Sequence, residues 1–90
     1  MNETAIEYVP EVRVLDGENQ LVSVGAAQLY PSLHSGEFFP QDCSRETLKR
    51  IPTRAARLQT KDGRSFSMPK VDRLCEGKNK PTHFHLDYHS

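Results

Sequence analysis

The 90-residue sequence has no tryptophan, only two cysteines and no long apolar segment. Cys43 and Cys75 lie far apart and form no Cys-x-x-Cys element, so neither a disulfide framework nor a cysteine-rich metal site is expected. No apolar run approaches the roughly 20 residues of a membrane-spanning helix, and the mean hydropathy of −0.68 agrees. The first residues are acidic and lack the basic start and apolar middle of a signal peptide. We therefore expect a cytoplasmic protein without a membrane partner.

Sequence patterns that support catalysis are also missing. There is no Gly-x-Ser-x-Gly element, the glycines form no phosphate-binding loop, and the acidic residues are dispersed singly. A domain of this size hides about 60–65% of its unfolded surface, which leaves little room for a deep substrate pocket. We expect residues 1–90 to form a single small domain that is not an enzyme and carries no cofactor, unless a metal is bound as described below.

Short segments that alternate apolar and polar residues are separated by turn signals. Residues 11–14 alternate before Asp16-Gly17-Glu18-Asn19, where we expect Gly17 to take a positive φ and residues 20–28 to return as a strand. Residues 56–59 and 65–68 alternate around Lys61-Asp62-Gly63 and predict a second hairpin.

One helix is predicted, over residues 44–51. Asp42 or Ser44 can cap its first turn, and Pro52 ends it. Counting the remaining segments gives five to seven short strands. The sequence therefore predicts an all-β fold, β-rich α+β at the margin, arranged as a small antiparallel barrel or roll.

The last segment, residues 83–89, alternates in its chemistry at every position. Side chains alternate across a strand, so one face is expected to carry Phe84, Leu86 and Tyr88 and the other His83, His85, Asp87 and His89. Two imidazoles at i and i+2 can share a divalent metal such as zinc, which makes His83 and His85 a candidate metal site. A polar, solvent-facing row is the alternative interpretation.

Two adjacent aromatic residues, Phe38 and Phe39, lie in a short predicted strand that ends at Pro40. Adjacent side chains of a strand point to opposite sides, so one ring can remain outside the core, near Tyr30, as an anchor for a partner. Protein–protein interaction through this surface or an edge strand, with another protein or a second copy in a homodimer, is the principal functional prediction. The alternative is a strand covered on both faces.

Charge is distributed unevenly along the chain although the formal net charge is zero. Residues 1–44 carry a net charge of −6, whereas residues 45–90 carry +6. Guanidinium groups suit phosphate oxygens, so the basic half predicts, as an alternative function, binding of nucleic acid or another anionic ligand through Arg50, Arg54, Arg57 and Arg64. Pairing between the acidic and the basic half is the other interpretation of the asymmetry.

Overall fold

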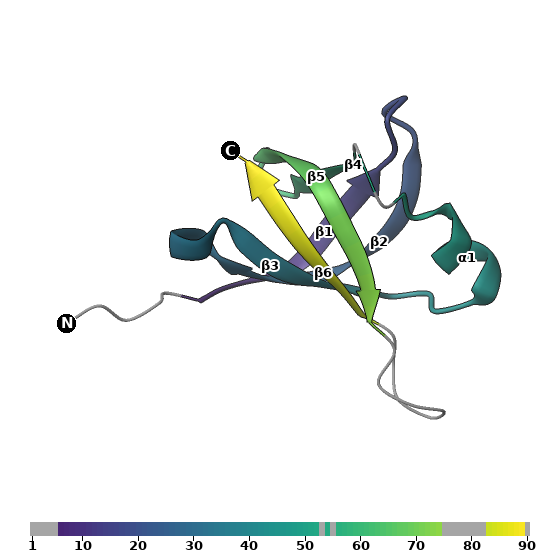
Figure 1. Cartoon of the computed structure of the whole chain (residues 1–90), viewed down its shortest axis with the longest axis horizontal. Coiled ribbons are helices and arrows are strands. Elements are labelled where there is room, and N and C mark those ends of the chain that lie inside the picture. The colour runs from purple at the N-terminus through teal and green to yellow at the C-terminus, as the bar shows by residue number, and fades with distance from the viewer. Residues whose placement is uncertain (1–5, 53, 55, 75–82, 90) are drawn as a thin grey trace.

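The protein is a closed antiparallel β-barrel with one short α-helix (Figure 1). The computed structural model describes residues 6–52, 54, 56–74 and 83–89. Its elements are β1 (Glu7–Leu15), β2 (Leu21–Tyr30), the 3-10 turn η1 (Pro31–Leu33), β3 (Ser35–Pro40), α1 (Arg45–Arg50), β4 (Ala56–Thr60), β5 (Ser65–Leu74) and β6 (His83–His89). The strand order around the barrel is β1-β2-β3-β6-β5-β4. The predicted barrel and the predicted helix are both confirmed.

The barrel interior is filled by the apolar side chains of the alternating strands. Leu58 of β4 and Leu86 of β6 are fully buried, as are Val12 of β1 and Phe38 of β3 to within 1%. On β6, Phe84, Leu86 and Tyr88 are all buried, as predicted from their spacing. Each large apolar side chain contributes about 1.5–3 kcal/mol by leaving water.

The two hairpins form at the predicted turns, but a different type of residue takes the positive φ in each turn. In the β1–β2 turn, Asp16 Oδ1 accepts hydrogen bonds from the backbone N–H groups of Glu18 and Gln20, at 2.8 and 2.9 Å. Asn19, at φ 63°, takes the left-handed conformation that was expected of Gly17. Asparagine tolerates that region because its short amide can bond locally. In the β4–β5 turn, Gly63 has the positive φ, 97°.

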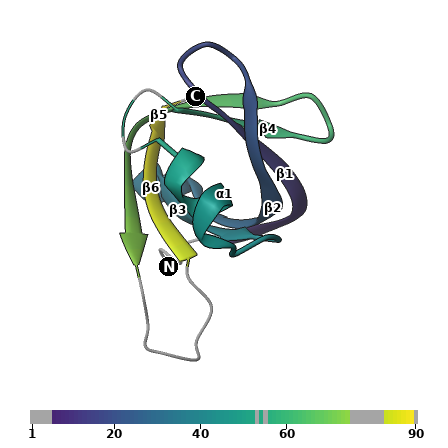
Figure 2. The ribbon, with the colours of Figure 1, turned by 90° about the vertical axis from the view of Figure 1, so that its right-hand side faces the viewer.

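Helix α1 closes one end of the barrel, as Figure 2 shows, with the helix lying in front of the strands. Ser44 is the N-cap, and its Oγ accepts a hydrogen bond from Thr47 N at 3.3 Å. Two turns of helix are marginal alone. Leu48 packs against the core and Ile51, just after the helix, is part of it, so packing holds the helix in place.

Aromatic rings of β5 and β6 also pack against each other in the core. Phe66 and Tyr88 meet edge to face, with ring centroids 4.9 Å apart. His34, just after η1, contacts the Tyr88 ring in the same manner at 6.4 Å, and Arg64 lies over Phe66 at 5.8 Å. Burial raises the pKa of Tyr88 above its ordinary value.

Because the sheet closes into a barrel, the described strands include no edge strand of the kind that the sequence suggested as a binding surface. Every strand pairs on both sides for part of its length, so no whole strand is free for a partner. Strand β1 pairs with β4 only from Val12 to Leu15, and its earlier residues pair with β2 alone. None of the helices among the described residues is long and apolar enough to cross a membrane.

Candidate protein-binding groove

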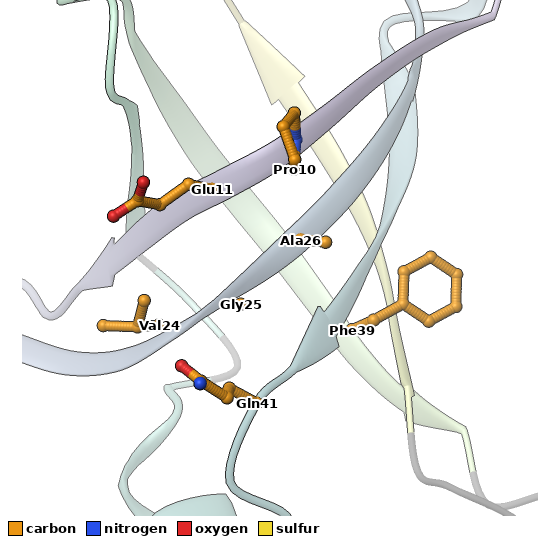
Figure 3. Close-up of a pocket in the computed structure, with 7 residues that line it drawn as sticks. All are labelled: Pro10, Glu11, Val24, Gly25, Ala26, Phe39 and Gln41. Carbon is orange, nitrogen blue, oxygen red and sulfur yellow. The ribbon is translucent and has the colours of Figure 1, made fainter.

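A groove of about 480 Å³ lies on the outer surface of the barrel, across β1, β2 and β3. Its floor is formed by the small β2 residues Val24, Gly25 and Ala26. The side chains of Pro10 and Glu11 rise from β1 on one side, and those of Phe39 and Gln41 come from the β3 side (Figure 3). The hollow results because the middle strand carries smaller side chains than the strands beside it.

Two irregularities in the sheet shape this groove. Between Val9 and Val12 the β1–β2 register shifts, so Pro10 and Glu11 together lie opposite Ala26 in a β-bulge. At Gly25, a Cβ atom would overlap the carbonyl oxygen of Phe39. Glycine is therefore required for β2 and β3 to come this close.

Phe38 and Phe39 point to opposite sides of β3, as predicted for adjacent residues of a strand. Phe38 is only 1% exposed and contacts the Phe84 ring at 6.3 Å in the core. Phe39 is 36% exposed at the wall of the groove. Its ring stacks on the buried His83, with centroids 5.6 Å apart and an interplanar angle of 27°, which supports the ring from one side.

Two of the three residues predicted for this surface lie elsewhere. Phe38 belongs to the barrel core because its position in the alternation faces inward. Tyr30 lies at the far end of β2, opposite Ser35, whereas Ala26 lies opposite Phe39. The Tyr30 hydroxyl donates to Gln28 Oε1 at 3.4 Å. Only Phe39 therefore contributes to the groove.

Two carboxylates share the outward face of the sheet with Phe39. Glu11, in the β1 bulge, forms a 3.4 Å ion pair with Lys61, and both side chains are mostly exposed. Glu37 lies two residues before Phe39 on the same outward face of β3 and is partly exposed. An exposed ion pair is weak in water, so the Glu11 carboxylate remains able to meet a cation from a partner.

The residues that define the groove were not predicted as a set. Gly25, isolated within a strand pattern, was a signal for a close approach of backbones. Pro10, within the first strand, was a signal for a bulge. Neither signal identifies which strand lies on the other side, so the groove could not be located from them.

The four predicted anion-binding arginines are not equivalent. Arg50, Arg54 and Arg57 are exposed. Arg64 instead donates two hydrogen bonds to Glu7, from Nη1 to Oε1 at 2.9 Å and from Nη2 to Oε2 at 2.7 Å. Its Nε also lies 3.2 Å from Asp62 Oδ2. Arg64 does not lie across from Arg57 in the β4–β5 hairpin, because Arg57 pairs with Ser67.

These contacts shift the titration of the groups involved. The hydrogen bonds from Arg64 hold the pKa of Glu7 below its usual range. The same hydrogen bonds raise the pKa of Arg64 further above its usual value. The hydroxyl of Thr60 donates to Asp62 and lowers the pKa of that carboxyl.

The acidic and basic halves of the chain partly neutralise each other. The pairs Arg64–Glu7 and Lys61–Glu11 both join the β4–β5 turn to β1. Within the described part of the chain, six basic side chains form neither an ion pair nor a hydrogen bond: Arg13, Arg45, Lys49, Arg50, Arg54 and Arg57.

The candidate metal residues have other contacts. His83 is buried against Phe39, and His85 Nε2 lies 3.6 Å from Asp87 Oδ1. Among the described residues, no group of three His, Cys, Asp or Glu side chains could hold a metal ion. The side chain of His89 lies outside the described residues, as does Cys75, whereas Cys43 is an exposed free thiol.

No protein-family model, no curated protein and no solved structure matches this chain.

Proposed function

We propose that the protein is a non-enzymatic interaction module whose outer groove receives an extended segment of a partner protein. The observation that carries this proposal is the partly exposed Phe39 ring at the wall of a groove of about 480 Å³. The floor of small β2 residues leaves space for one bulky apolar side chain beside that ring. Aromatic anchors in such depressions dominate the binding energy of many interfaces.

The charges around the groove define the chemistry of the partner segment. Glu11 lies across β2 from Phe39, Glu37 lies two residues before Phe39 on β3, and none of the described residues that line the groove is a cation. Complementary charges increase the association rate and reject partners of the wrong sign. The partner segment is therefore expected to carry an aromatic or aliphatic residue flanked by lysine or arginine.

A panel of fluorescent heptapeptides tests this proposal directly by fluorescence polarisation. The peptides carry a central Phe, Leu or Ala and are flanked by either Lys or Glu. Peptides with a central Phe or Leu and Lys flanks should bind, whereas Ala-centred and Glu-flanked peptides should not. Absence of binding by every Lys-flanked peptide would refute the proposal.

Variants of the full chain locate the binding. Phe39→Ala should weaken peptide binding at least tenfold, the scale of a hot-spot residue. Leu33→Ala is the matched control, since Leu33 is an exposed apolar residue of η1 outside the groove. Equal losses in both variants would overturn the assignment.

The charge preference and a second copy of the chain are tested separately. Glu11→Gln should reduce the difference between Lys-flanked and Glu-flanked peptides. Sedimentation of the protein alone tests whether a second copy occupies the groove. A dimer that Phe39→Ala dissociates would contradict the proposal of a foreign peptide as the partner.

A further inference from the structure

The outer face of β1, β4 and β5 carries two arginines whose side chains have no carboxylate partner among the described residues. We define this basic face by the outward residues Arg13, Arg57, Gln59, Ser65 and Ser67. In the register, Arg13 lies opposite Gln59, which lies opposite Ser65, while Arg57 lies opposite Ser67. The β1–β4 pairing that closes the barrel therefore makes Arg13, from the acidic half of the chain, a diagonal neighbour of Arg57, from the basic half.

The two arginines of the basic face are free to bind a ligand. Neither Arg13 nor Arg57 makes a side-chain hydrogen bond or ion pair with any described residue, and both side chains are exposed. Diagonal neighbours on adjacent strands lie about 7–8 Å apart. This spacing holds for the backbone, and two long arginine side chains that start from it can reach the same phosphate group or two neighbouring ones.

The surroundings of these arginines keep them available. At one end of the face, Glu11 lines a hollow together with Arg13 and Gln59, but its carboxylate lies 3.4 Å from Lys61 and forms no ion pair with Arg13. At the other end, Asp16 lines a hollow beside Arg57, but its Oδ1 accepts two backbone hydrogen bonds within the β1–β2 turn. The neighbouring side chains Gln59, Ser65 and Ser67 are neutral and can donate hydrogen bonds to an oxyanion.

We propose that the basic face binds a chain of phosphate groups, with Arg13 and Arg57 as the principal contacts. Guanidinium groups recognise phosphate through paired hydrogen bonds. No residue of this face is aromatic, so it lacks the stacking platform that holds unpaired bases. The ligand is therefore recognised through its phosphates and not through base sequence. A nucleic acid backbone and inorganic polyphosphate both present this chemistry.

Binding of a fluorescent, mixed-sequence 20-base DNA strand to the full-length protein tests the proposal. Two phosphate contacts on a single strand give a salt slope of about −1.4, so affinity should fall about sevenfold between 50 and 200 mM salt. Strands of different sequence should bind equally. The double variant Arg13→Gln/Arg57→Gln should weaken binding at least tenfold and make it nearly independent of salt.

The matched control removes two positive charges from α1. Arg45→Gln/Lys49→Gln changes the net charge equally, and both side chains are exposed and unpaired within the described part of the chain. It should leave binding within about twofold of wild type. If the control double variant loses as much affinity, or if wild type does not bind at low salt, the proposal is refuted.

Two further measurements separate the sources of phosphate and the two proposed sites. In the first, inorganic polyphosphate competes with the bound DNA at equal phosphate concentration. If it displaces the DNA fully, a chain of phosphates is sufficient for binding; if it displaces the DNA only weakly, the nucleic acid backbone is the preferred ligand. Phe39→Ala should not change DNA binding, because Phe39 belongs to the groove on the β1–β3 side. Failure of one proposal therefore leaves the other unaffected.

Discussion

Replacing Glu7 by glutamine tests how the first part of β1 is held without β4 beside it. Glu7 lies where β1 pairs with β2 alone, and its carboxylate accepts both terminal nitrogens of Arg64 at 2.9 and 2.7 Å. The two side chains are 40% and 39% exposed, so solvent screens the pair. We expect Glu7→Gln to lower the free energy of unfolding by about 1 kcal/mol, the upper end for exposed pairs.

The pH dependence of this loss follows from the lowered pKa of Glu7. Arg64 favours the charged carboxylate in the folded protein, so the folded pKa lies below the ordinary value of 4.5. The stabilisation is therefore complete above that value and disappears as pH falls through the folded pKa. Wild type and Glu7→Gln should differ fully at pH 7, and the difference should be smaller at pH 3, which lies below the ordinary pKa of 4.5.

Urea denaturation at both pH values measures the difference. The matched control is Glu11→Gln, which removes a single, longer contact to Lys61 at 3.4 Å between more exposed side chains. We expect Glu11→Gln to lower the free energy of unfolding by less than about 0.3 kcal/mol. Equal losses for the two variants at pH 7, or a Glu7→Gln loss that persists undiminished at pH 3, would refute the reasoning.

Three further substitutions can be compared by the same urea assay, two of them inside the barrel and one on its surface. The Ser23 hydroxyl is buried without a hydrogen-bond partner among the described residues. Ser23→Ala should therefore leave the free energy of unfolding unchanged or raise it by up to about 1 kcal/mol. A decrease of more than about 1 kcal/mol would reveal a partner for the hydroxyl. Phe38→Ala should lower the free energy of unfolding by about 3–5 kcal/mol, whereas Phe39→Ala should lower it by about 1 kcal/mol. Equal decreases would contradict the opposite orientations of the two side chains.

The local elements could be predicted because their determinants lie close together in the chain. The cap at Ser44 and the stop at Pro52 define α1 within one residue at each end. The period of two over residues 83–89 correctly places Leu86 in the core. In each case the residues that decide the structure are within a few positions of one another.

Contacts between distant segments could not be predicted, because sequence spacing does not indicate which strands become neighbours. Arg64 and Glu7 are 57 positions apart and meet only because the β4–β5 turn reaches β1. The same limit applies to Arg13, which belongs to the acidic half by sequence and to the basic face by position. The left-handed residue of the first turn was missed for a local reason, since Asn19 and Gly17 can both adopt that conformation.

The seam between β1 and β4 determines how much charge remains on the surface. It joins the first strand of the acidic half to the first strand of the basic half. Near the β4–β5 turn, carboxylates of β1 meet Lys61 and Arg64, and the charges cancel. Further along the seam, β1 contributes Arg13 in place of an acid, and the positive charge remains. A zero net charge therefore coexists with a basic face, and one strand pairing produces both.

The filled barrel interior explains why both proposed sites lie outside. Small barrels of this type fill their interior with side chains, and here the inward rows of β1, β4 and β6 are buried. Both proposals therefore rest on outward residues, whose chemistry can change without disturbing the core. Phe39 and Arg57 both occupy such outward positions on opposite sides of β1 in the strand order. The proposed groove and the proposed basic face therefore lie on the two sides of β1, and each can be tested with its own variants.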